Sequence, residues 1–127
     1  MVTYKLFKEK EMVLLDISGE TSYSEFVECF DAAVKDPDYS RTYSGITVFR
    51  DDTKLEMSRK ETMELAEYVV SNKLSDGKWA VLANKPLETA LTLIYQERVT
   101  SQHEASVFSS IEGASEYLDI DLKEILG

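Results

Sequence analysis

The fold is decided by one stretch of the chain, residues 78–117, which reads KWAVLANKPLETALTLIYQERVTSQHEASVFSSIEGASEY. Residues 79–83 form an unbroken apolar run, which is typical of a strand buried on both faces of a parallel sheet. Pro86 follows closely, and proline suits the first position of a helix because that N–H has no partner within the helix. The stretch therefore predicts a buried strand that leads directly into a helix over residues 86–100.

The same stretch continues into a second strand and a second helix. Residues 104–109 (EASVFS) predict the strand, and from residue 111 the apolar side chains recur at helical spacing. The last residues, 121–126, predict one more helical turn. We expect the helix over residues 86–100 to bury one side, made of Leu87, Ala90, Leu91, Ile94 and Tyr95.

The N-terminal residues predict a β-hairpin. Apolar residues alternate with polar ones over residues 2–6, and alternation over residues 12–17 places Val13, Leu15 and Ile17 on one face of a strand. The polar group at residues 8–11 separates the two strands and predicts a charged turn. Gly19 is expected to end the second strand.

Two more helices and one more strand lie between the hairpin and residue 78. Each helix opens with capping-box spacing, Ser22 with Glu25 and Ser58 with Glu61, in which each side chain satisfies a free backbone N–H of the first turn. Between them, residues 45–49 (GITVF) predict a strand, residues 50–54 a polar loop, and residues 55–57 a lead into the second helix. The expected apolar stripes are Phe26, Cys29, Phe30, Ala33 and Val34 in the first helix, and Leu65, Ala66, Val69 and Val70 in the second.

The complete order is β-β-α-β-α-β-α-β-α. Strands that alternate with helices predict an α/β fold with a five-stranded, mostly parallel mixed sheet, about four helices and an antiparallel N-terminal hairpin. No repeat, low-complexity segment or linker divides the chain, so we expect residues 1–127 to form a single domain.

Composition narrows the class of protein. The hydrophobic fraction of 43% in 127 residues excludes a disordered chain, and the apolar runs are far shorter than the roughly 20 residues that span a bilayer. With 24 acidic and 14 basic residues the net charge is −10, which repels nucleic-acid backbones and anionic lipid. The basic cluster Lys5, Lys8 and Lys10 lies beside two glutamates, so it predicts only a solvated hairpin face. One cysteine and the absence of a secretory signal predict a cytoplasmic protein.

Three parts of the chain carry a family resemblance: residues 91–95 (LTLIY), residues 104–108 (EASVF) and residues 111–118 (IEGASEYL). With the element order, they resemble the SpoIIAA-like family, small bacterial proteins related to STAS domains and more remotely to CRAL-TRIO lipid-binding domains. The matching positions are Val107, Phe108, Glu112, Ala114, Tyr117 and Leu118. The resemblance covers nearly the whole chain in element order, and it implies a single β/α superhelix and a family whose biochemical function is mostly unassigned.

The resemblance also directs attention to residues 50–54. STAS domains that antagonise anti-sigma factors carry a phosphorylated serine in an Asp-Ser-Ser-Gly-like loop at this place, whereas this chain has Asp51, Asp52, Thr53 and Lys54. We regard these four residues as a candidate binding loop, and Thr53 and Ser58 as candidate phospho-acceptors. The alternative for Ser58 is a plain helix cap, and Asp51 and Asp52 would repel a phosphate.

Other candidate sites have simpler interpretations. Asp51 and Asp52 could contribute two oxygens to Mg²⁺, but the sequence places no third carboxylate beside them. Cys29 is expected to be a buried apolar residue, and His103, the single histidine, a solvated loop residue, so a Cys–His catalytic pair is not expected. No phosphate-binding glycine loop, dinucleotide motif or Cys/His metal set is present, and we expect no cofactor and no catalytic residues.

The sequence thus predicts a non-enzymatic, cytoplasmic, STAS-like binding or regulatory module that acts through a protein partner. Homodimerisation is a second option, to which Tyr4, Tyr39 and Tyr43 could contribute. The alternative function is binding of a small apolar molecule or lipid, by analogy with CRAL-TRIO domains.

Overall fold

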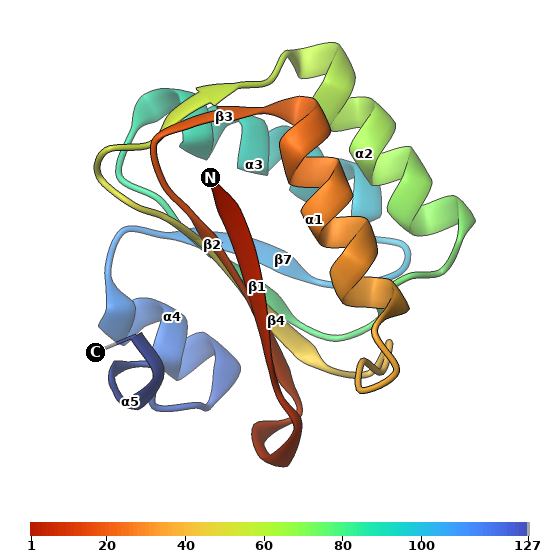
Figure 1. Ribbon diagram of the computed structural model, residues 1–127, viewed down its shortest axis with the longest axis vertical. Helices are drawn as coiled ribbons and strands as arrows, with labels where there is room; N and C mark the ends of the chain where they lie inside the picture. The colour runs from red at the N-terminus through yellow and green to blue at the C-terminus, as the bar shows by residue number, and fades with distance from the viewer. Residues whose placement is uncertain (127) are drawn as a thin grey trace.

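The computed structural model describes residues 1–126 and confirms the predicted α/β class. Five strands form one mixed sheet in the order β1-β2-β4-β6-β7 (Figure 1). Only β1 is antiparallel, to β2, and the other neighbours run parallel. The strands are β1 (Val2–Phe7), β2 (Met12–Ile17), β4 (Ser44–Phe49), β6 (Trp79–Leu82) and β7 (Ala105–Phe108).

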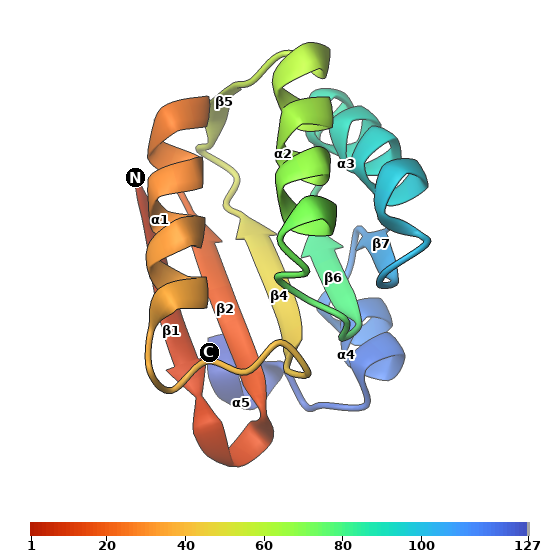
Figure 2. The same cartoon turned by 90° about the vertical axis from the view of Figure 1, so that its right-hand side faces the viewer.

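Helices cover both faces of this sheet. Three helices connect consecutive parallel strands and lie on one face of the sheet, as Figure 2 shows. Crossovers between parallel strands are right-handed, and each new strand is added on the same edge of the sheet, so the connecting helices all lie on the same face. Two C-terminal helices cover the other face (Figure 1). The first group is α1 (Tyr23–Lys35), α2 (Arg59–Ser71) and α3 (Pro86–Val99), and the second is α4 (Ile111–Leu118) and α5 (Lys123–Leu126).

The sheet divides the interior into two apolar cores. Alternation along β2 places Val13, Leu15 and Ile17 in the core under α1–α3, and Met12 and Leu14 in the core under α4 and α5. Strand β6, which lies between β4 and β7, is buried on both sides, as its apolar run predicts. The stripes predicted for α1 and α2 also face the first core, with Phe26, Phe30, Ala33, Leu65, Ala66 and Val69 buried.

Trp79 is the largest side chain of the first core. Its indole lies against the backbone of Gly45, where a Cβ would overlap the ring, and its Nε1 donates to Thr47 Oγ1 at 2.8 Å. Phe30 packs edge-on to the ring at a centroid distance of 6.2 Å. Glycine at position 45 therefore makes room for the tryptophan of the neighbouring strand.

A second, two-stranded sheet was missed by the sequence interpretation. β3 (Glu20–Ser22) and β5 (Lys54–Glu56) pair in parallel, where the sequence predicted the end of a strand and a lead into a helix. Each strand has three residues, which is too short for an apolar period to show, and the pairing joins segments about 34 residues apart in sequence. This small sheet lies beyond the carboxyl ends of β2 and β4 (Figure 1).

The buried side of α3 was predicted correctly only in part: Leu91 is buried and Tyr95 packs against the first core, as expected. Leu87 and Ala90 are exposed, and Glu88 and Thr92 are buried in their place, together with Leu91 and Val99. Apolar residues occur on every side of this helix, so their spacing does not identify the inner side. The packing of α3 against α2 and β7 determines it instead.

Candidate functional site

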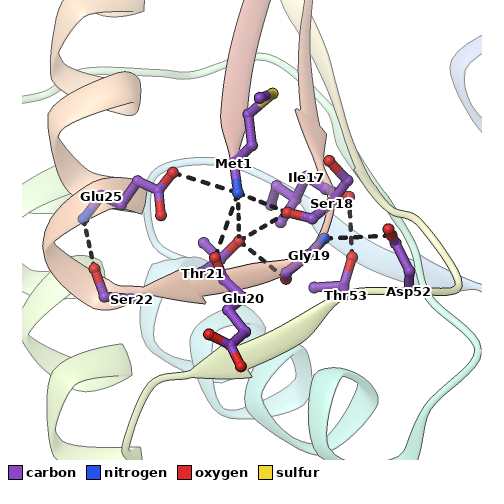
Figure 3. A network of polar contacts seen from close by, with 10 residues as sticks. All are labelled: Met1, Ile17, Ser18, Gly19, Glu20, Thr21, Ser22, Glu25, Asp52 and Thr53. Carbon is purple, nitrogen blue, oxygen red and sulfur yellow. Dashed lines mark hydrogen bonds and ion pairs between the residues drawn. The ribbon is translucent and has the colours of Figure 1, made fainter.

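The predicted binding loop lies at the carboxyl end of β4, the edge at which open α/β sheets commonly bind ligands. Asp51, Asp52 and Lys54 are exposed. Asp52 Oδ1 accepts a hydrogen bond from the backbone N–H of Gly19 at 3.3 Å (Figure 3). Lys54 N–H donates to Gly19 O at 2.8 Å. The loop is therefore fastened to the end of β2 by these bonds.

Thr53 is the buried member of the loop. Its side chain is 1% exposed, and its hydroxyl donates to Ile17 O at 3.0 Å (Figure 3). Ser58, by contrast, forms the complete capping box that the sequence predicts, with Glu61 N–H donating to Ser58 Oγ at 3.0 Å and Ser58 N–H to Glu61 Oε1 at 2.9 Å. The phospho-acceptor hypothesis stays a prediction, and for Thr53 it requires the loop to open first.

A network of polar contacts holds β3 beside this loop, as Figure 3 shows. Thr21 is 1% exposed and its hydroxyl donates to Ser18 O at 3.3 Å. The Met1 amino group donates to Ser18 O at 2.6 Å and lies 3.3 Å from the Glu25 carboxylate. The capping box predicted for Ser22 and Glu25 is therefore only half formed. Ser22 Oγ accepts a hydrogen bond from Glu25 N–H at 3.2 Å, but the Glu25 carboxylate pairs with the Met1 amino group.

The start of α3 meets the candidate loop. Lys85 precedes the helix without a side-chain cap, and Pro86 occupies the first helical position as predicted. Lys85 Nζ donates to the Thr53 carbonyl oxygen at 2.5 Å, so one lysine connects the loops that follow β4 and β6.

Glu88 is the residue of this region that the sequence interpretation missed. It is 3% exposed, and burial raises the pKa of its carboxyl. The Lys85 ammonium and backbone N–H lower that pKa in part, and Asp51 raises it further. One signal was available: Pro86 at the first helical position places residue 88 at the third, where a glutamate can fold back over the helix start.

Glu88 lines a cavity in the first core, between the sheet and helices α1–α3. The cavity measures about 70 Å³, well under the roughly 300 Å³ at which drug-sized ligand pockets begin. It has no room for a lipid chain, which weighs against the lipid-binding alternative. The lining is aromatic and aliphatic except for Thr47, Thr62, Glu88 and Thr92. We call this space the core cavity.

The sequence predicted that His103 would be a solvated loop residue, but in the structure it is buried. It is 4% exposed, its Nε2 lies 3.1 Å from the Tyr95 hydroxyl, and its Nδ1 lies 3.3 Å from Gly77 O. Burial lowers the pKa of the imidazole. The prediction was wrong because the loop after α3 folds back, with His103 N–H donating to Val99 O at 3.0 Å.

Cys29 is half-buried on α1, and burial raises the pKa of its thiol. A raised thiol pKa disfavours the thiolate that nucleophilic catalysis requires. Both nitrogens of His103 lie beside partners other than Cys29. Within residues 1–126, no three His, Cys, Asp or Glu side chains converge as a metal site would require.

The tyrosines proposed for an interface are engaged within the chain. The Tyr4 hydroxyl donates to Asp36 Oδ2 at 2.9 Å, the Tyr39 hydroxyl donates to Leu74 O at 2.7 Å, and Tyr43 is 7% exposed. Their polar groups and ring surface are thus largely used inside the molecule.

The outer side of α3 presents a different surface. Leu87 and Leu93 are 50% and 51% exposed, and Pro86 and Ala90 are exposed between and beside them. We call these four residues the α3 strip. A shallow groove runs along it, bordered at the sheet end by Ala83, Asn84 and Ser109.

Comparison of the chain with known protein families, with curated proteins and with solved structures gives no match. None of the helices in residues 1–126 has the length and apolar character needed to cross a membrane.

Proposed function

We propose that this protein is a non-enzymatic, STAS-like regulatory module of the cytoplasm that docks a protein partner on the α3 strip. The observation that carries the proposal is the shallow groove along Pro86, Ala90 and Leu93 on the outer side of α3, in which Leu93 is 51% exposed. Large apolar side chains grouped on a surface are typical of interaction sites, whereas single ones are ordinary.

The strip suits an apolar, elongated partner segment. Pro86, Ala90 and Leu93 follow one another at helical spacing, and the groove beside them continues to the ends of β6 and β7. The net charge of −10 favours a partner with basic residues around its apolar contact. An amphipathic helix with a basic rim has both properties.

A second copy of the chain is the other candidate occupant. Two α3 strips related by a two-fold axis would each contact the same residues of the other copy, as in isologous dimers. The like charge of the two copies works against this arrangement, so we favour the basic partner.

The test compares two aspartate substitutions. Leu93→Asp places a charge in the α3 strip, and the matched control Ala32→Asp places the same charge at an exposed position of α1. Each immobilised protein is used to capture partners from a lysate of the source cells, with quantification by mass spectrometry. We expect wild type and Ala32→Asp to retain the same basic protein, and Leu93→Asp to bind it at least about tenfold more weakly.

Two results would overturn the proposal. One is equal retention of the partner by Leu93→Asp and Ala32→Asp, which would place the contact elsewhere. The other is a wild-type protein that retains nothing beyond an uncoated matrix. Sedimentation of wild type and Leu93→Asp distinguishes the homodimer, because only the wild type would then form dimers.

A further inference from the structure

The wall of the core cavity is polar at few points, and three of these are threonine hydroxyls that hydrogen-bond within the chain. Thr47 Oγ1 accepts from Trp79 Nε1 at 2.8 Å. Thr62 and Thr92 each donate to the carbonyl oxygen four residues earlier in their own helix, at 3.0 and 2.7 Å. These hydroxyls therefore need no partner inside the cavity.

Glu88 and Tyr95, which also line the cavity, have partners of their own. The Glu88 carboxyl interacts with the backbone N–H of Lys85, and the Tyr95 hydroxyl lies 3.1 Å from His103 Nε2. A buried water normally makes two to four hydrogen bonds to polar groups that would otherwise lack partners. The wall does not offer such a set, so the cavity favours an apolar occupant over water.

The cavity lies toward the carboxyl ends of the strands, where open α/β sheets bind ligands. Leu15, Phe49 and Val81 line it from the second halves of β2, β4 and β6. Leu55 of β5 and Met57 line it as well and are half-buried, so entry from this end requires only that this short segment shift. A void in a core costs stability in proportion to its volume, and a bound molecule restores the lost contacts.

We propose that the core cavity binds a small neutral apolar molecule, a short aliphatic of about three or four non-hydrogen atoms. This site goes beyond the docking function of the α3 strip and does not depend on it. The two sites use opposite sides of α3: Leu91 and Thr92 face the cavity, and Leu87 and Leu93 face outward.

The volume and the lining of the cavity together define this ligand. The volume of about 70 Å³ is roughly half that of the 150 Å³ cavity that accepts benzene, so an aromatic ring or a lipid chain is too large. A charged or strongly polar molecule would lose its hydration without gaining partners inside. A compact aliphatic molecule loses no hydrogen bond and gains dispersion contacts with the branched and aromatic side chains of the wall.

Xenon and propane are the probes, and ethanol is the polar molecule with as many non-hydrogen atoms as propane. We would record methyl NMR spectra of the full chain under increasing pressure of each gas. We expect saturable shifts at Leu15, Val69 and Leu91, which line the cavity, and no saturable shift at Leu122 in the second core. A ligand of about three non-hydrogen atoms binds no more tightly than about 0.5 mM, so the expected dissociation constants are millimolar. Ethanol should give no saturable shift.

Two valine substitutions on α2 give the matched comparison. Val69→Ile adds one methylene to the cavity wall, and Val70→Ile adds the same group at the next residue, which does not line the cavity. We expect Val70→Ile to bind both gases as wild type does. Val69→Ile should bind them at least about tenfold more weakly, because the added group occupies the space of the ligand.

A third variant keeps the test decisive if Val69→Ile folds poorly. Val81→Ile adds the same methylene from the sheet side of the cavity, and circular dichroism checks that each variant retains the native fold. The proposal is overturned if wild type shows no saturable shift with either gas over the millimolar range, or if ethanol binds as propane does. It is equally overturned if a folded Val69→Ile or Val81→Ile binds the gases as tightly as wild type.

Discussion

Two glutamates stand at the third position of neighbouring helices, Glu61 in α2 and Glu88 in α3. Glu61 accepts from the backbone N–H of Ser58 and completes a capping box at the surface. Glu88 follows Lys85, which offers no side-chain cap, and it is buried against the core cavity. The same residue at the same helical position thus stabilises a helix start at the surface in one case and lines an apolar cavity in the other.

The difference arises from the residues that precede each helix. Ser58 supplies a hydroxyl that pairs with the glutamate, and the exposed start of α2 lets the carboxylate remain near water. Lys85 instead extends its side chain to Thr53 O and so ties α3 to the loop after β4. Both glutamates interact with the backbone N–H of the residue that precedes their helix, and they differ in that Glu88 is buried beside the core cavity.

Among the substitutions that test the difference between Glu61 and Glu88, we expect Glu88→Leu to change the free energy of unfolding most. Leucine fills similar space without a charge, so we expect the free energy of unfolding to rise by about 1–3 kcal/mol, as measured by urea denaturation. Loss of stability would instead show that the carboxyl supports the fold, as Glu61 does, and the contrast would fail.

A smaller effect of opposite sign is expected at the other glutamate. Glu61→Ala leaves the Ser58 N–H without its partner and should lower the free energy of unfolding by about 1 kcal/mol. The same denaturation series measures it. An unchanged stability would mean that the capping box contributes little and that neither glutamate is explained by helix stability.

The smallest expected effect is a dependence on pH. The raised pKa of Glu88 means that the folded state holds the proton more firmly than the unfolded state does. The resulting stabilisation is full below the pKa of the unfolded chain and is lost as pH rises through the pKa of the folded chain. Lys85 opposes the shift and Asp51 adds to it, without reversing the effect of burial.

Urea denaturation between about pH 4 and pH 7 measures this dependence as a difference between wild type and Glu88→Gln. The stability of wild type relative to Glu88→Gln should fall as pH rises, because glutamine does not titrate. A parallel course for wild type and Glu88→Gln would show that the Glu88 carboxyl is not perturbed by burial.

The sequence predicted the parts of the site that depend on local chemistry. The loop after β4, the capping box at Ser58 and the proline start of α3 were all found from neighbouring residues. The contact between Lys85 and Thr53 could not be found that way, because the two residues are 32 positions apart and meet only when β4 and β6 pair.

Local patterns alone determined most of the architecture of this protein. Alternating and continuous apolar runs specify the five main strands, and caps and prolines specify where the helices begin, because these signals act within a few residues. Tertiary packing decided which side of α3 faces inward, that His103 is buried, and that β3 pairs with β5. The physical reason is that apolar residues are spread around α3 and that β3 and β5 are short, so only contacts with distant segments distinguish their alternatives.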